Sequence, residues 1–192
     1  MSGIVNHLES RLGPMGGGWS VNLGDASGKL TVCSFYGGNI SGVTSFSTVG
    51  LSNFPLRDLK DPEDDRDYHI EIIGCQYAPQ GDYGPFPGSL EGVASQLISS
   101  GDLLRRGDIV DLPGPMAPGS EMVALYAAMP VYFDPDFSSV HLEDGRGVAI
   151  VWMIPIGAAE VEFVRTYGWE EFEARLTMQD PDLLDLGRPQ IL

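Results

Sequence analysis

Histidine and cysteine, the residues that most often carry chemistry, are scarce in this chain. The histidines are His7, His69 and His141, and the cysteines are Cys33 and Cys75. None has a second histidine or cysteine at the spacing of a metal-ligand pair. Both cysteines lie in apolar, strand-like contexts that suit buried and reduced thiols. This pattern predicts no metal site, no cofactor and no catalytic residue of these types.

Two glycine-containing stretches were tested against motifs of catalysis and phosphate binding. Gly50-Leu51-Ser52 continues into Asn53-Phe54, so the closing glycine of a nucleophile elbow is missing. Gly16-Gly17-Gly18 precedes Trp19 with no strand before it and no Gly-Lys-Ser/Thr after it. The sequence therefore predicts a flexible connector at these glycines rather than a phosphate loop.

Carboxylates dominate the ionisable groups of the chain. There are 27 Asp and Glu against 11 Lys and Arg, which gives a formal net charge of -16. Such a charge repels nucleic acid phosphates and anionic lipid head groups, so neither nucleic acid nor a membrane is an expected partner. The charge fits either plain solubility or an acidic face that attracts a basic protein.

The acidic residues are most concentrated at positions 57–67, between two strand patterns. Asp61, Glu63 and Asp65 have the first three spacings of a calcium loop, but Arg66 stands where that loop needs glycine. The segment is therefore predicted to be an exposed acidic loop. Its proposed partner-contacting residues are Asp61, Glu63, Asp64 and Asp65.

A second surface that could contact a partner is the loop at positions 76–88, which is rich in Gly, Pro and aromatic residues. Irregular surface loops often carry binding. Its proposed partner-contacting residues are Tyr77, Tyr83 and Phe86. The sequence does not decide between this aromatic loop and the acidic loop.

The segment 146–176 is expected to organise the fold. Val148 to Ile156 is almost unbrokenly apolar and predicts a strand covered on both faces, with pairing on one side ended by Pro155. A helix is predicted to follow up to Gly168, where a positive φ would close it. A second helix should run from Trp169 to Leu176.

The remaining patterns complete an α+β domain. Strands are predicted around 30–36, 43–51, 68–72 and 122–129, the last with a short helix as the alternative, and helices around 4–12 and 89–98. We expect a single domain spanning 1–192, with an N-terminal helix and flexible loop at 1–29 and the core at 30–192. The sheet is expected to be mixed and mostly antiparallel, with the helices packed on one side.

The spacing of several residues in and after the predicted central strand resembles that of the suppressor of fused domain family. The ordered residues are Trp152, Pro155-Ile156, Glu160, Gly168, Phe172 and Arg188-Pro189. Residues 43–52, 86–98 and 119–129 are similar to its early strand, long helix and a later strand, so the likeness covers roughly 31–189. Trp152, Pro155, Glu160, Gly168 and Arg188 are taken as structural residues of the family pattern.

The resemblance implies a non-catalytic protein-binding domain. The two-domain member that gives the family its name sequesters a transcription factor by clamping a peptide between its domains, and this chain matches only the N-terminal one. Single-domain bacterial members are regarded as immunity proteins, which bind and neutralise a toxin. The resemblance therefore implies a protein partner, of which a basic toxin is one kind.

Two further expectations concern residues that could act in a site. Glu160 is interpreted as a helix-start residue, with Arg188 as a bidentate partner that could hold the C-terminal tail to it. An enzyme that uses a carboxylate and a histidine in a cleft, with no motif identified, is the alternative function. Because Met1 to Arg11 has no signal-peptide pattern, the cytoplasm is the expected location.

Overall fold

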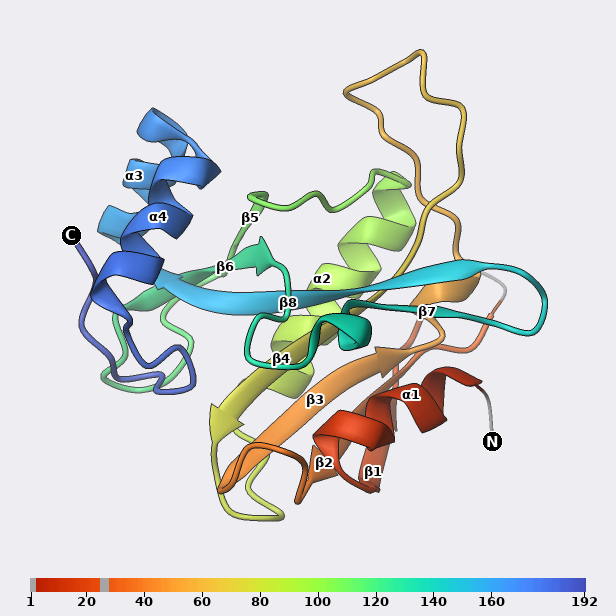
Figure 1. Ribbon diagram of the computed structural model, residues 1–192, viewed down its shortest axis with the longest axis horizontal. Coiled ribbons are helices and arrows are strands. Elements are labelled where there is room, and N and C mark those ends of the chain that lie inside the picture. Colours follow the sequence, from red (N-terminus) through yellow and green to blue (C-terminus); the bar gives the residue numbers. More distant parts are fainter. Residues whose placement is uncertain (1–2, 25–27) are drawn as a thin grey trace.

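The computed structural model describes residues 3–24 and 28–192 as one α+β domain built on a single eight-stranded sheet (Figure 1). Residues 1–2 and 25–27, within the predicted N-terminal segment 1–29, lie outside the described residues. The strands are β1 (Met15–Ser20), β2 (Thr31–Tyr36), β3 (Val43–Val49), β4 (His69–Tyr77), β5 (Ile109–Asp111), β6 (Met122–Ala128), β7 (Ser139–His141) and β8 (Gly147–Gly157). The helices are α1 (Gly3–Leu12), α2 (Phe86–Ser100), α3 (Ala158–Tyr167) and α4 (Trp169–Gln179), with 3-10 turns η1 (Leu51–Asn53) and η2 (Pro135–Ser138).

The sheet has the strand order β1-β2-β3-β4-β8-β6-β5, and β7 also pairs with β8. The pair β4 and β8 is parallel and the other pairs are antiparallel. The predicted mixed, mostly antiparallel sheet is therefore confirmed. A parallel pair needs a long crossover, and the chain between β4 and β8 contains α2, β5, β6 and β7.

Strand β8 is the central element, as the apolar run predicted. Its side chains alternate between buried and more exposed from Gly147 to Val151, and every residue from Trp152 to Gly157 is buried. The predicted burial of both faces is therefore found in the second half of the strand. In the first half one face is partly open, and Ala149 is exposed.

Pairing on one side of β8 ends before Pro155 is reached, and pairing on the other side continues past it. The parallel ladder with β4 stops at Ile73 and Trp152, whereas the antiparallel ladder with β6 includes Leu125 and Pro155. The N–H and C=O of one strand residue point to the same side, and the Pro155 carbonyl accepts a hydrogen bond from the Arg188 side chain at 3.1 Å. The missing N–H therefore faces the side that β4 has left.

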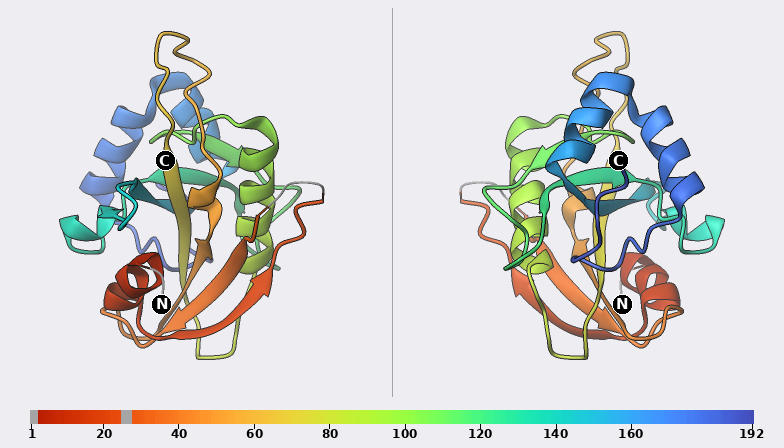
Figure 2. Two further views of the ribbon diagram at one scale, coloured as in Figure 1. Left: turned by 90° about the vertical axis from the view of Figure 1, so that its right-hand side faces the viewer. Right: turned by 90° about the vertical axis from the view of Figure 1, so that its left-hand side faces the viewer.

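The helices cover both faces of the sheet, which corrects the expectation that they lie on one side. Helices α1, α3 and α4 belong to one apolar cluster with the buried face of Trp152, and α2 belongs to a second cluster on the opposite face. Figure 2 shows α2 across the sheet from α1, α3 and α4. Most strands of the sheet supply apolar side chains to both clusters, and each layer needs helical cover.

The glycines at 16–18 form part of β1, which corrects the predicted flexible connector. Gly17 pairs with Ser34 and Trp19 with Val32. A strand that is held by backbone hydrogen bonds needs no large side chains. Glycine also fits sterically, since a Cβ on Gly18 would lie 2.8 Å from the methyl group of Thr31.

Removal of the Trp152 side chain tests the central position of β8. The side chain is fully buried and packs on Tyr132 with 4.9 Å between ring centroids. Trp152→Ala should lower the free energy of unfolding by roughly 3 to 5 kcal/mol, because it leaves a large cavity. Trp152→Phe should lower the free energy of unfolding by less, since an aromatic ring remains. Urea denaturation followed by circular dichroism measures both, and an alanine variant as stable as the wild type would contradict this placement.

The two cysteines provide a second test of burial. Burial raises the pKa of the Cys33 thiol to about 11, with a smaller contribution from the charge of Glu71, and burial raises that of Cys75 to about 12. Only the thiolate is nucleophilic, so the raised pKa values keep both groups protonated and unreactive near neutral pH. A thiol-reactive chromophore should label neither cysteine in the folded chain and both after denaturation. Rapid labelling of the native protein would contradict the burial.

Candidate functional site

The acidic loop, residues 57–67, projects from one end of the molecule (Figure 1). Its base is closed by a two-residue bridge in which Leu56 N donates to Tyr68 O at 2.9 Å and Tyr68 N donates to Leu56 O at 2.8 Å. The bridge leads directly into β4. The loop is therefore a closed excursion from the sheet, and its side chains have solvent around them.

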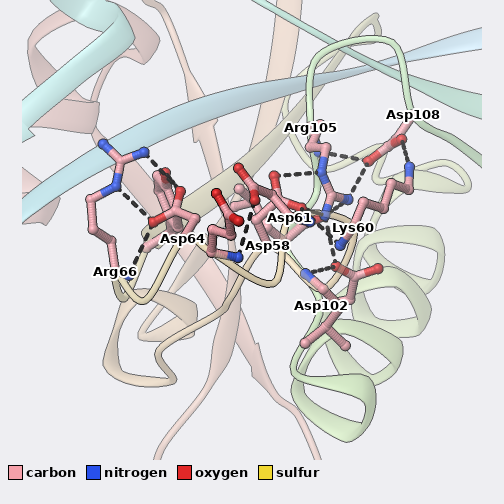
Figure 3. Close-up of polar contacts among 12 residues, drawn as sticks. Asp58, Lys60, Asp61, Asp64, Arg66, Asp102, Arg105 and Asp108 are labelled. Atoms are coloured by element: carbon pink, nitrogen blue, oxygen red, sulfur yellow. Dashed lines mark hydrogen bonds and ion pairs between the residues drawn. The ribbon is translucent and has the colours of Figure 1, made fainter.

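Several cations neutralise part of the charge of the acidic loop, as Figure 3 shows for its contacts with the segment 102–108. Arg105 pairs with Asp58 through both ends of its guanidinium and also reaches Asp102 at 3.1 Å. Lys60 Nζ reaches Asp108 Oδ1 at 2.9 Å. These contacts fix the loop against the chain that leads into β5.

Of the four carboxylates that the sequence proposed here, Asp64 is engaged within the loop. Arg66 donates two hydrogen bonds to it, at 2.8 and 2.7 Å, and the Tyr68 hydroxyl donates a third at 2.6 Å. These donors hold the pKa of Asp64 well below its usual range. Asp61, Glu63 and Asp65 are exposed, and no Lys or Arg of the described residues pairs with them. The free charge of the loop therefore resides on these three.

The aromatic loop lies at the other end of β4. Its chain leaves the strand at Tyr77, whereas the acidic loop enters at Tyr68, and nine strand residues span about 30 Å. Tyr77 and Tyr83 are 52% and 41% exposed. The two surfaces proposed from the sequence are thus well separated and do not form one continuous patch.

Phe86 is not a surface residue, which corrects its proposed partner contact. It begins α2, is fully buried and stacks on Phe46 with 6.1 Å between ring centroids. Its ring occupies the space above Gly74, where a Cβ would lie 2.1 Å from it. The aromatic character that suggested a binding loop here belongs to the core.

Glu160 and Arg188 form the buried ion pair that the sequence suggested. Their oxygen and nitrogen atoms approach to 2.7 and 3.0 Å, and their side chains are 0% and 3% exposed. Glu160 also accepts hydrogen bonds from Gly157 N at 2.8 Å and Ile191 N at 3.1 Å. The carboxylate is fully occupied by the start of α3 and by the C-terminal tail, so its role here is structural.

Glu71 of β4 is a second buried carboxylate. It is fully buried and accepts hydrogen bonds from the backbone N–H groups of residues 50–52, at 2.9 to 3.2 Å, and from the Ser52 hydroxyl at 2.7 Å. Burial raises the pKa of this carboxyl, and the donors oppose that shift. A lone Glu between Ile70 and Ile72 was the only signal in the sequence.

His69 lies beside this turn, where the enzyme alternative would place a carboxylate and a histidine together. Its Nδ1 lies 2.9 Å from the backbone carbonyl of Ser52, and Arg146 donates to the same carbonyl at 2.9 Å. The imidazole contacts the Ser52 carbonyl and not the Ser52 hydroxyl, which donates to Glu71. These hydrogen bonds fix the turn.

Metal-binding clusters and helices that could span a membrane are both absent from residues 3–24 and 28–192. No group of three or more His, Cys, Asp and Glu side chains there is arranged to hold a metal ion. No helix in that part of the chain has both the length and the apolar character needed to cross a bilayer.

Comparisons with known proteins identify one family by sequence and a shared fold by structure. The sequence pattern described as Suppressor of fused protein (SUFU) matches residues 27–189. A putative SUFU homolog from Neisseria gonorrhoeae is similar in structure with a TM-score of 0.76 and 16% identity, over 98% of this chain and 94% of that one. A chain of the Sufu-Fu complex is similar with a TM-score of 0.67 and 15% identity, over 98% of this chain and 90% of that one. Drosophila Suppressor of Fused is similar with a TM-score of 0.59 and 16% identity, over 85% of this chain and 42% of that one. No match is found among curated proteins.

The Glu160–Arg188 pair predicts a large effect on stability. Glu160→Gln should lower the free energy of unfolding by roughly 3 to 5 kcal/mol, because the Arg188 charge would remain buried without a counter-charge. Arg165 pairs with Asp111 on the surface, where both side chains are more than half exposed, and offers a matched control. Arg165→Gln should lower the free energy of unfolding by at most about 1 kcal/mol. Equal losses in thermal or urea unfolding would contradict the structural role of the buried pair.

Proposed function

This chain belongs to the suppressor of fused family, and from that premise we propose that it is a non-catalytic domain that binds a basic protein through its acidic loop. Its proposed biological role is that of an immunity protein, which neutralises a toxin by binding it. The observation that carries the proposal is the group of free carboxylates, Asp61, Glu63 and Asp65, on a loop that projects into solvent.

Electrostatics supports a basic partner for this loop. The net charge of -16 gives the whole chain an attractive field for cations, and the loop carries three exposed carboxylates that pair with no Lys or Arg of the described residues. At physiological ionic strength such a field acts over about 8 Å, enough to steer a partner before contact. Exposed charges of this kind affect the association rate more than the dissociation rate.

The strand next to the loop supports a protein as the partner. Strand β5 ends the sheet, and Asp108 directly before it pairs with Lys60 of the acidic loop. The outer edge of a terminal strand can pair with an extended segment of another chain. The Sufu-Fu complex is a protein complex of a chain with this fold. A partner steered by the loop would arrive at this edge.

Neutralising the free carboxylates tests the proposal. The variant Asp61→Asn/Glu63→Gln/Asp65→Asn should lower the association rate several-fold at low salt, and the difference should shrink as salt is added. Its dissociation rate and thermal stability should stay close to wild type. The partner is captured from lysate of the producing cell with the purified chain, identified by mass spectrometry, purified and used for stopped-flow binding.

A matched control removes the same charge elsewhere. Asp82, Glu91 and Glu143 are exposed and lie outside the acidic loop. Their Asn and Gln variants together should change the association rate less than the loop variant does. A rate that is independent of salt, or equal in the two variants, would overturn the role of the loop.

The immunity role has its own test in the same experiment. The captured protein should arrest growth when it is produced alone and should not do so when this chain is produced with it. If the captured protein is not toxic, the immunity role is overturned, and the proposal that the chain is a protein-binding domain still stands.

A further inference from the structure

An apolar groove opens between α4, the end of β6 and the tail residues 180–183. Its volume is about 240 Å³, and Ile154 of β8, Leu176 of α4 and Leu183 of the tail are among its lining residues. Sites for small molecules usually measure roughly 300 to 1,000 Å³. The groove is therefore better matched to one inserted side chain than to a cofactor.

The mouth of the groove is unusually apolar for so acidic a chain. Met129 and Val131 line it and are 42% and 68% exposed. Its charged lining residues are Glu173 and Asp180, and no Lys or Arg lines it. An apolar side chain inserted here would lie beside negative charge, so a cation next to that side chain would complement the rim.

Asp180 is the free charge on this rim. Glu173 is engaged by Arg106 and by the Tyr126 hydroxyl, which donates to it at 2.9 Å. Asp180 is exposed and follows α4 with φ 44 and ψ 54, the only non-glycine residue of the described chain with a positive φ. Glycine adopts this conformation with less strain. Among the described residues, Asp180 therefore supplies the unpaired negative charge of the groove rim.

The groove adjoins the acidic loop through two neighbouring arginines. Arg105 pairs with Asp58 of the loop, and Arg106 pairs with Glu173 of the groove. Gly107 N then donates to Ala127 O at 2.8 Å, next to Ala128 in the groove lining. Residues 105–107 therefore link the base of the acidic loop to the groove.

We propose that the groove binds one apolar side chain, of Leu or Met size, from the basic protein partner, and that a Lys or Arg beside it on the partner meets Asp180. The inference rests on the proposed function for the basic character of that partner. It assigns the two surfaces different tasks. The acidic loop raises the rate of encounter, and the groove sets the lifetime of the complex.

Short peptides test the chemistry without the natural partner. The full chain, labelled with ¹⁵N, is titrated with the blocked tripeptide Lys-Leu-Arg and with the matched tripeptides Lys-Ser-Arg and Glu-Leu-Glu. Saturable amide shifts at residues 128–132 and 176–183 are expected with Lys-Leu-Arg. Each matched peptide should bind about tenfold more weakly or not at all, since it lacks the anchor or the cations.

Two substitutions separate binding from stability. Asp180→Gly should keep or raise the melting temperature, because it relieves the positive φ, and should weaken Lys-Leu-Arg binding several-fold. Val131→Ser should weaken it by about tenfold. Met178→Ser is the matched control, since Met178 is 76% exposed on α4 and does not line the groove. That variant should bind like the wild type.

The possible outcomes separate this inference from the proposed function. Shifts elsewhere, equal binding of the three peptides, or unchanged binding by Asp180→Gly and Val131→Ser would overturn the groove, whether or not the acidic loop steers the captured partner. Groove shifts that depend on protein concentration without peptide would assign it to a second copy of the chain and also overturn the inference. Specific peptide binding combined with a salt-independent association rate would support the groove and refute the loop.

Discussion

The buried ion pair of Glu160 and Arg188 is the interaction on which the second half of the fold depends. Glu160 lies in the first turn of α3, and its oxygens receive donors from Gly157 at the end of β8 and from Arg188 and Ile191 of the C-terminal tail. Arg188 completes the junction by donating to Pro155, where β8 has lost its neighbour β4. A buried charge is tolerated only where such partners surround it. The tail is thereby fixed against the sheet, and its earlier residues, 180–183, form one wall of the apolar groove.

A second buried carboxylate does the same for the first half. Glu71 lies in β4 and gathers the backbone donors of the turn after β3, while His69 and Arg146 hold the carbonyl of Ser52 from outside. Arg146 directly precedes β8. The turn is therefore connected to both strands of the parallel pair. Two buried acids thus connect the central strands to the turn after β3 and to the C-terminal tail.

The sequence predicted the elements that local patterns encode. Its predictions failed where contacts between distant residues determine the structure. The apolar run of β8, the helix before Gly168 and α1 are visible as periodicity, and all three are present. The Glu160–Arg188 pair could be suggested because a helix-start acid needs donors. Phe86 was misplaced because its burial depends on Gly74, twelve residues away in another element. The pairing of the acidic loop with residues 102–108 and the cover of both sheet faces depend equally on tertiary contacts that no local window contains.

The position of β8 in the chain has a consequence for how the protein is made. The strands β1 to β4 are synthesised first and end in β4, while β5 and β6 follow as a separate pair. Neither group touches the other in the sheet until β8, residues 147–157, is available to lie between them. During synthesis β4 and β6 therefore both present an open edge, and such edges pair readily with other chains. The nascent chain is most vulnerable to aggregation over this interval, so a ribosome-associated chaperone would act most usefully before β8 emerges.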